Sequence, residues 1–258
     1  MSPAWDGAAL AASPRFAVLH TILAELPAGR APTLDDLNAA AACRGLANAS
    51  GQPIRFVAAD GKGDYEGRIA ASGEVPMRAG TWHDLFNALA WLAFPVAKAA
   101  LNRLHAEHRV PGERGTARDV LTLFDEDGLV LLTADSTLGD LLRAFQWRRL
   151  LVERRADVRR DTRFLVFGHA LHEKLLAPFR GLTAKVLVIE VEPAALAAPA
   201  VELLRRVDLE TAAAMAPALV STRALAPLPV QGIPGWWPAN EDPAFYDDTG
   251  QFRPGRRK

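Results

Sequence analysis

A stretch rich in histidine, asparagine and tryptophan, from 81 to 108, holds the first side chains that suit chemistry. It predicts a helix beginning at Trp82, because Thr81 and Asp84 have the spacing of a helix-capping pair. A solvent-facing helix surface normally carries Glu, Lys and Arg at intervals of three and four. One stripe of this helix instead carries His83, Asp84, Asn87, Trp91, Phe94, Lys98, Leu101, Asn102 and His105. Free N–H groups at the helix start favour an anion and a neutral histidine, so the stripe predicts a small-anion site.

A second set of candidates lies in the stretch from Phe164 to Pro178, which we also interpret as a helix. His169 and Glu173 are four residues apart and therefore share a face, while His172 is turned about a sixth of a turn away. Gly168 leaves room beside His169 for another backbone to approach closely. The sequence therefore offers a second helix whose polar face can meet the first.

The leading hypothesis is a small-molecule enzyme or ligand-binding protein whose site forms where these two helices meet. The residues expected in catalytic positions are His83, Asp84, Asn87, Lys98, His169 and Glu173. The residues expected to contact an anionic ligand are Trp91, Asn102, Arg118 and Asp119. The hypothesis requires that His83 and His169, which are far apart in the chain, lie within about two side-chain lengths of each other.

A metal-dependent version of this hypothesis uses nitrogen and oxygen ligands that suit zinc, iron or manganese. Its ligands would come from His83, Asp84, His169, His172 and Glu173. Their spacing matches no established metal motif, and the zinc pattern H-E-x-x-H, the phosphate loop and the nucleophile elbow are all missing. We therefore assign no metal and name no cofactor at this stage, and each histidine alone also fits a structural role.

Two alternatives need no catalysis. If a helix continues past Arg148, one side of it carries Arg148, Arg149, Arg155, Arg159, Arg160 and Arg163. That face would hold an acidic partner or nucleic acid, although such faces are usually only solvated. In the other alternative, the polar stripe holds the C-terminal segment in place, with Trp91 stacked beneath it.

Composition limits the class of protein. The 258 residues include 30 basic and 30 acidic side chains, and half are hydrophobic, which is an ordinary globular balance. A net charge near zero argues against a general nucleic-acid binder. The single Cys43 cannot form an internal disulfide. No secretory signal is visible. The apolar run 85–101 is interrupted by Asn87, Pro95 and Lys98, which makes it a poor membrane-spanning segment. We expect a cytoplasmic protein that does not enter the membrane.

The pattern of elements predicts a helix-rich α+β fold with a small mixed or antiparallel sheet, in a single domain. Its segments are an N-terminal helical part (1–50), an α+β body (51–220) and an extended strap rich in Pro, Gly and Trp (221–258). Pro95 should break the long helix near 93–94. The sheet should contain a strand at 185–191 and a hairpin at 119–132 that turns at Asp127 and Gly128. A second hairpin should join 54–58 to 65–69.

Several blocks of sequence together resemble a bacterial family, the domain of unknown function 3025. They are W-H-D-L-F-N-A-L-A-W-L-A-F-P-x-x-K at 82–98, R-D-V-L-T-L-F-D-E-D-G at 118–128, F-G-H-A-L-H-E-K at 167–174, and G-I-P-G-W, F-Y-D-D and F-R-P near the end. The resemblance covers the chain from about Ile54 onward and implies a shared fold. It implies no activity, substrate or cofactor.

Overall fold

The larger of the two sheets that the structure describes has four strands in the order β4-β3-β5-β6. The computed structural model describes residues 4–61, 64–108, 116–219 and 221–255. The strands of the larger sheet are β3 (Gly128–Thr133), β4 (Thr162–Val166), β5 (Thr183–Glu190) and β6 (Ala226–Pro229). Every residue of β3 is buried, as expected for a central strand. β3 pairs antiparallel with β4 and parallel with β5, so the sheet is mixed, as predicted. The strand predicted at 185–191 is confirmed as β5.

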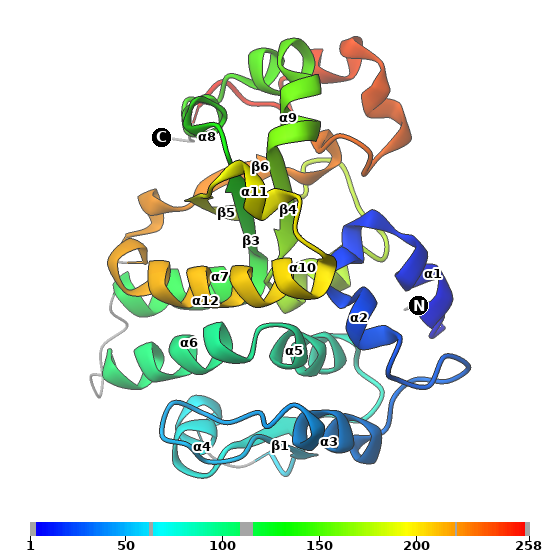
Figure 1. Ribbon diagram of the computed structural model, residues 1–258, viewed down its shortest axis with the longest axis vertical. Coiled ribbons are helices and arrows are strands. Elements are labelled where there is room, and N and C mark those ends of the chain that lie inside the picture. The colour runs from blue at the N-terminus through cyan, green and yellow to red at the C-terminus, as the bar shows by residue number, and fades with distance from the viewer. Residues whose placement is uncertain (1–3, 62–63, 109–115, 220, 256–258) are drawn as a thin grey trace.

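Helices dominate the rest of the fold, and the α+β class is confirmed. They are α1 (Gly7–Ala12), α2 (His20–Leu23), α3 (Leu34–Cys43), α4 (Tyr65–Ser72), α5 (Trp82–Ala93), α6 (Pro95–Glu107), α7 (Thr116–Asp127), α8 (Ser136–Arg143), α9 (Arg155–Asp161), α10 (His169–Lys174), α11 (Pro193–Leu196) and α12 (Ala200–Ala218). Helices α7, α10 and α12 lie near one end of the large sheet, α5 and α6 form the next layer, and α3 and α4 lie beyond it (Figure 1). The middle layer is therefore enclosed on both sides.

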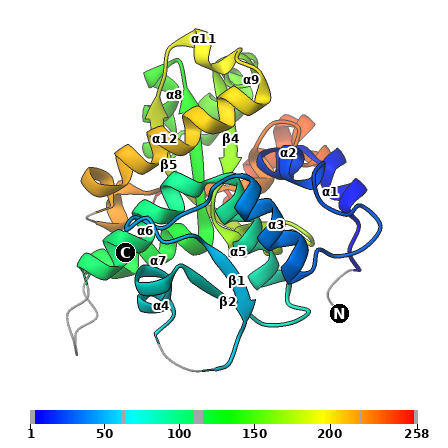
Figure 2. The ribbon, with the colours of Figure 1, turned by 60° about the horizontal axis from the view of Figure 1, so that its bottom comes forward.

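A two-stranded parallel sheet of β1 (Arg55–Ala58) and β2 (Glu74–Met77) lies in the outer layer beside α3 and α4 (Figure 2). The hairpin predicted for 54–58 with 65–69 is wrong, because residues 65–72 form α4 and connect the two parallel strands. A parallel pair needs such a crossover, whereas a hairpin can only make an antiparallel one. Consequently Tyr65 and Glu66 lie in the first turn of a helix.

The helix break predicted at Pro95 is confirmed. α5 ends at Ala93, α6 begins at Pro95, and the two are bent by 113°. The proline removes one backbone donor, and the carboxylate of Asp208 on α12 accepts the next two N–H groups, from Val96 at 3.0 Å and Ala97 at 2.7 Å. Within the described ranges, no single helix has the length and apolarity to cross a membrane, although this bent pair passes that test when counted together.

The hairpin predicted for 119–132 is also wrong, because residues 116–127 form helix α7 and only 128–133 form a strand. The buried Val120, Leu121 and Phe124 recur at the spacing of a helix, which outweighs the turn tendency of Asp127-Gly128. Gly128 instead joins the helix directly to β3, where a Cβ would lie only 2.2 Å from the Phe124 carbonyl oxygen. The helix 164–178 is likewise shorter than predicted, since β4 runs to Val166 and α10 begins at His169.

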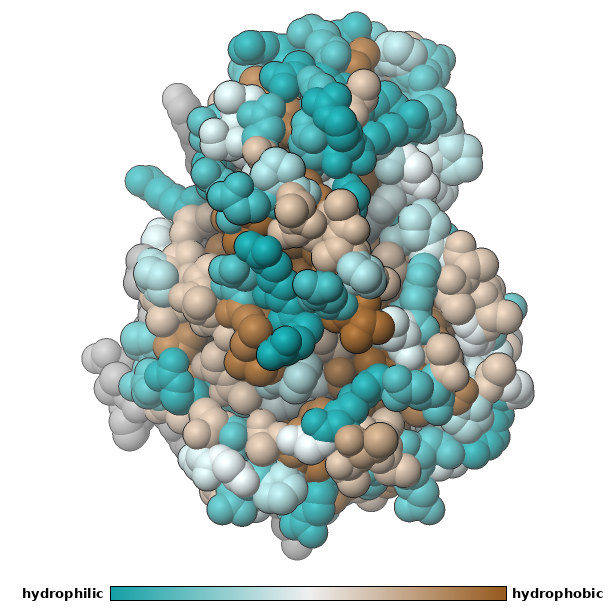
Figure 3. Space-filling view, in the orientation of Figure 1, coloured by the Kyte–Doolittle hydropathy of each residue, from teal (hydrophilic) through white to brown (hydrophobic). Residues whose placement is uncertain are grey.

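The C-terminal strap packs against the body through large side chains up to its last described residue, Gly255, and residues 256–258 lie outside the described part. Its buried Phe252 and Tyr246 pack together, and the Trp147 Nε1–H donates to the Arg253 carbonyl oxygen at 2.6 Å. After β6, the strap thus lies at the α8–α9 end of the molecule (Figure 1), an end covered largely by hydrophilic residues (Figure 3). Among the described residues, none of its hydrogen bonds or ion pairs reaches the polar stripe of α5 and α6.

Candidate functional site

The sheet topology brings the end of α7 and the start of α10 to the same place. α7 leads directly into β3, α10 follows directly from β4, and these two strands are antiparallel neighbours. The amides of Phe167 and Gly168 both donate to the Gly128 carbonyl oxygen, at 3.0 and 2.9 Å. Residues just before Gly128 therefore lie next to residues just after Gly168.

Gly168 is the residue that permits this approach. A Cβ at this position would lie 2.4 Å from the Glu126 carbonyl oxygen and 2.5 Å from the Gly128 nitrogen, distances that real Cβ atoms do not adopt. The close backbone approach predicted beside His169 is confirmed. The absence of a side chain here sets His169 against the last turn of α7.

His83 and His169 meet although 86 residues separate them. α5 packs against α10, and the Nε2 atoms of the two imidazoles lie 3.0 Å apart. The Nδ1 of His83 lies 3.3 Å from a Glu173 carboxylate oxygen, and the Nδ1 of His169 lies 3.8 Å from an Asp125 carboxylate oxygen. Each ring therefore has one nitrogen facing the other ring and one beside a carboxylate.

A buried ion pair supports His169 from behind. The Lys98 ammonium donates to Asp125 Oδ1 at 2.5 Å and to Asn87 Oδ1 at 2.9 Å, and the Asn87 amide donates to the Tyr65 hydroxyl at 2.5 Å. Burial alone would raise the pKa of Asp125, but the Lys98 charge and His169 hold it well below its usual range. Lys98 and His169 thus hold Asp125 as an anion inside the protein.

The opposite wall carries a second carboxyl group with the reverse tendency. Burial, and then the negative charge of Asp125, raise the pKa of Glu66, while the Asn102 amide donates to a Glu66 carboxylate oxygen at 2.6 Å. Burial also lowers the pKa of His105 to about 4 and raises that of the Tyr65 hydroxyl. Neighbouring carboxyl groups with oppositely displaced pKa values are the usual basis of acid and base roles in one site.

These side chains surround a cavity of about 340 Å³. Its walls include His83, Asn87, Arg118, Asp125, Glu126 and His169. Arg118 is half-buried and, among the residues that the structure describes, has no hydrogen-bonding or ion-pair partner. The cavity therefore combines a histidine pair, a fixed anion and an uncommitted guanidinium group.

The structure places the other sequence-predicted residues around or away from this cavity. Asp84 lines it but is held by Arg78, whose guanidinium donates to both carboxylate oxygens at 2.9 and 2.8 Å. Asn102 lies behind Glu66, and Glu173 lies behind His83. Trp91 is buried in the core with its ring 5.7 Å from the Lys98 nitrogen, and Asp119 is exposed outside the lining.

The lining residues missed in the sequence include Tyr65, Glu66, Arg78, Asp125 and Glu126. A helical interpretation of 116–127 would have placed Arg118, Thr122, Asp125 and Glu126 on one face, at intervals of four, three and one. Assigning Asp125 and Glu126 to a hairpin tip hid this pattern. His172 cannot be a ligand in the metal alternative, since it is buried against Phe16 and Phe86 and its Nδ1–H donates to the Gly168 carbonyl oxygen.

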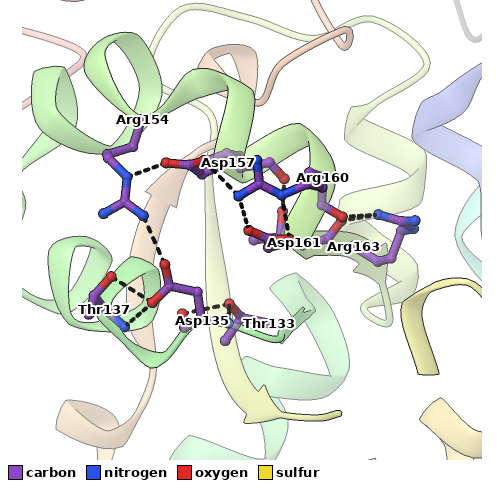
Figure 4. A network of polar contacts seen from close by, with 10 residues as sticks. Thr133, Asp135, Thr137, Arg154, Asp157, Arg160, Asp161 and Arg163 are labelled. Carbon is purple, nitrogen blue, oxygen red and sulfur yellow. Dashed lines mark hydrogen bonds and ion pairs between the residues drawn. The ribbon is translucent and has the colours of Figure 1, made fainter. Parts of the chain in front are cut away.

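The arginine-rich segment does not form a free basic face. Arg160 pairs with Asp157 and Asp161, and Arg154 pairs with Asp157 and Asp135, in one network (Figure 4). Arg155 and Arg159 bind Glu241 of the strap. Arg163 lies on β4 and donates to backbone carbonyl oxygens, while Arg148 pairs with Asp247. Most of this positive charge is therefore neutralised within the protein.

A helix-rich α+β fold with a polar cavity at one end of a mixed sheet is the class that these observations define. Residues 54–256 match the family model described as "Protein of unknown function (DUF3025)", and the chain belongs to that family. No curated protein and no solved structure matches the chain.

Proposed function

We propose that this protein is a small-molecule enzyme whose active site is the cavity between α5, α7 and α10. His83 and His169 would exchange a proton with the substrate, and Arg118 would bind an anionic group on it. The observation that supports this most strongly is the meeting of the two histidines, Nε2 to Nε2 at 3.0 Å, in the wall of a cavity.

The surroundings support acid–base chemistry in three ways. The carboxylates of Glu173 and Asp125 lie beside the outer nitrogens of the two rings, where they fix ring orientation. Lys98 acts as a positioning residue, because it donates to Asp125 but does not line the cavity, and Asn87 in turn accepts a hydrogen bond from Lys98. Glu66, whose pKa is raised by burial, is a second proton donor opposite the ionised Asp125.

An anionic substrate is supported by Arg118. A guanidinium group without an acidic partner in the described structure is suited to bind a carboxylate or a phosphate through two parallel hydrogen bonds. Arg78, the other lining arginine, is already committed to Asp84. Arg118 is therefore the residue whose removal should most directly weaken anion binding.

The test is calorimetric titration of the intact protein with inorganic phosphate, pyrophosphate, and short mono- and dicarboxylates. At least one probe should bind, and Arg118→Ala should weaken it roughly 10- to 100-fold, the size of a charge-assisted hydrogen bond. Arg143→Ala is the matched control, because Arg143 is an exposed arginine on α8 paired with Asp140. Equal binding by Arg118→Ala, or no binding of any probe, would contradict the proposed anion site.

A further inference from the structure

The facing histidines have fewer hydrogens than their surroundings require. A neutral imidazole has one N–H group, so the two rings have two. The Glu173 carboxylate lies 3.3 Å from His83 Nδ1 and favours N–H at that nitrogen, whereas the Asp125 carboxylate, 3.8 Å from His169 Nδ1, is too far for a hydrogen bond and favours a proton there only through its charge. His83 Nε2 is then a lone pair directed at His169 Nε2 across 3.0 Å, and a proton on His169 Nδ1 leaves a second lone pair facing the first. Such an arrangement is repulsive unless a cation lies between them.

A third ligand atom lies at the same place. The Glu126 carboxylate oxygen is 3.6 Å from His169 Nε2, and one ligand atom each from His83, Glu126 and His169 lie within 4.8 Å of one another. His83 and Glu126 are half-buried, whereas His169 is 6% exposed and has a buried Nδ1 without a hydrogen bond among the described residues. Two nitrogens and one oxygen thus converge from the start of α5, the end of α7 and the start of α10.

The charge around the cavity also favours a cation. Among the described residues, the lining has four carboxyl groups, on Glu66, Asp84, Asp125 and Glu126, but two arginines. Lys98, bonded to Asp125, adds one further positive charge. With Glu66 kept as a proton donor, the other three carboxylates balance these three cations, and Glu173 beside His83 leaves one negative charge in excess. A bound cation would remove this excess and allow an anionic substrate to enter.

The spacing agrees with metal coordination. Two imidazole nitrogens at right angles, each about 2.1 Å from an ion, are about 3 Å apart. The carboxylates beside the outer nitrogens are the usual outer partners of metal-binding histidines, since they orient the ring and increase its basicity. We propose that His83 Nε2, His169 Nε2 and the Glu126 carboxylate bind one divalent first-row transition metal ion, with Glu173 and Asp125 as positioning residues.

The ligand set narrows the identity of the ion. Imidazole nitrogen and carboxylate oxygen suit zinc, iron, cobalt, nickel or manganese, and two histidines with one carboxylate leave coordination positions open. Those positions would face the cavity and Arg118. This inference deepens the proposed active site: a bound ion occupies both Nε2 atoms and leaves the exchange of protons with the substrate to Glu66, the second proton donor in the lining. Metal binding itself needs no substrate and is measured separately.

The experiment uses the full-length protein after dialysis against a chelator. Titration with Co²⁺, followed by visible absorption, reports both the number of ions and their coordination, and calorimetry with Zn²⁺ gives the affinity. One ion per chain should bind, with visible bands of nitrogen and oxygen coordination. His83→Ala and Glu126→Gln should each weaken binding at least about 10- to 100-fold, and Glu173→Gln about 10-fold. Both ligand variants change half-buried side chains, so their folding is checked by circular dichroism.

His108→Ala is the matched control, because His108 is an exposed histidine that follows α6. Its Co²⁺ affinity should equal that of the unchanged protein. The metal site is overturned if the folded protein binds neither Co²⁺ nor Zn²⁺ below about 1 mM, or if His83→Ala and Glu126→Gln bind as well as the control. If the two histidines share a proton instead of binding a metal ion, neither Co²⁺ nor Zn²⁺ should bind. Loss of metal binding with an intact Arg118-dependent anion site would overturn this inference alone, and the converse result would overturn only the proposed anion site.

Discussion

Charged side chains are concentrated both at the cavity and on the arginine-rich surface around α9. Only on the arginine-rich surface do the basic side chains described below all have acidic partners. Around α9, Arg154 and Arg160 share Asp157, and Arg155 and Arg159 share Glu241 of the strap. At the cavity, Arg118 has no partner among the described residues, and Glu126 and Glu173 face histidines. A high density of charge is thus common to both regions, and the balance of charge separates them.

Burial also differs between the two regions. The arginines on α9 are mostly exposed, so their ion pairs are screened by water and each contributes little to stability. The Lys98–Asp125 pair is buried, so each partner depends on the other. The comparison indicates that the arginine surface holds the strap, whereas the cavity keeps reactive groups in place at a cost in stability.

The largest expected effect is the loss of Lys98. Lys98→Met should lower the free energy of unfolding by about 3–5 kcal/mol, because it leaves the Asp125 charge buried without a counterion. Urea unfolding followed by circular dichroism measures the change. Arg103→Met, which breaks an exposed pair with Glu107 on the same helix, should change stability by less than about 1 kcal/mol. Similar losses in the two variants would remove the distinction between the regions.

The second prediction separates the core histidine of α10 from the two histidines at the cavity. Burial lowers the pKa of His172 from 6.5 to about 3. Below pH 6.5 the unfolded chain therefore takes up a proton that the folded chain does not. His172 therefore does not lower the free energy of unfolding above pH 6.5, but lowers it by about 1.4 kcal/mol per pH unit as the pH falls from 6.5 towards 3.

His172→Phe should remove this component, since Phe keeps the stacking with Phe16 and Phe86 but cannot be protonated. At pH 7 the free energy of unfolding of the variant should be about 1 kcal/mol lower, because the hydrogen bond to Gly168 is lost. As the pH falls, the variant should lose less stability than the unchanged protein. Unfolding free energies at a series of pH values between 7 and 4 test this. Parallel curves for the two proteins would mean that His172 is not the acid-sensitive group.

The third prediction concerns the backbone contact that forms the cavity. Gly168→Ala should destabilise the fold by about 1–3 kcal/mol, because its Cβ would lie 2.4 Å from the Glu126 carbonyl oxygen. It should also weaken Co²⁺ binding by moving His169 away from Glu126. Gly29→Ala is the control, since a Cβ there meets nothing within 4 Å. Thermal unfolding compares them, and unchanged stability and metal affinity in Gly168→Ala would show that the close approach is not required.

The smallest effect is expected on the arginine surface. Arg159→Ala removes an exposed ion pair with Glu241 that Arg155 also makes, so the loss should be below about 1 kcal/mol. Anion binding should be unaffected, because Arg159 does not line the cavity. Chemical unfolding and the phosphate titration measure both quantities. A loss above about 2 kcal/mol would show that this surface, too, carries an essential charge.

Sequence patterns were sufficient where the cause is local. Pro95 lacks its backbone donor wherever it stands, so the break between α5 and α6 was predictable, and Gly168 was recognised as a point of close approach. The error at 119–132 has a physical origin as well. The run V-L-T-L-F suits either a strand or a buried helix, and Asp-Gly suggests a turn, so only packing against the sheet decides between them.

The composition of the site was therefore only partly predictable. His83 and His169 were proposed as partners from their chemistry, but no spacing rule relates residues 86 positions apart, and their contact depends on the packing of α5 on α10. Glu126 was missed because the wrong secondary structure turned it away from Arg118. An error in one element thus removed two carboxylates from the expected site.

The Asp208 carboxylate gives the long helix α12 an influence on a cavity that none of its described residues lines. This carboxylate accepts hydrogen bonds from the backbone N–H groups of Val96 and Ala97, and Lys98 is the next residue. The position of Lys98 is consequently set by α12, which packs against α6, through the two hydrogen bonds that Asp208 accepts. Any rearrangement of α12 would be transmitted through these hydrogen bonds to Asp125 and then to His169.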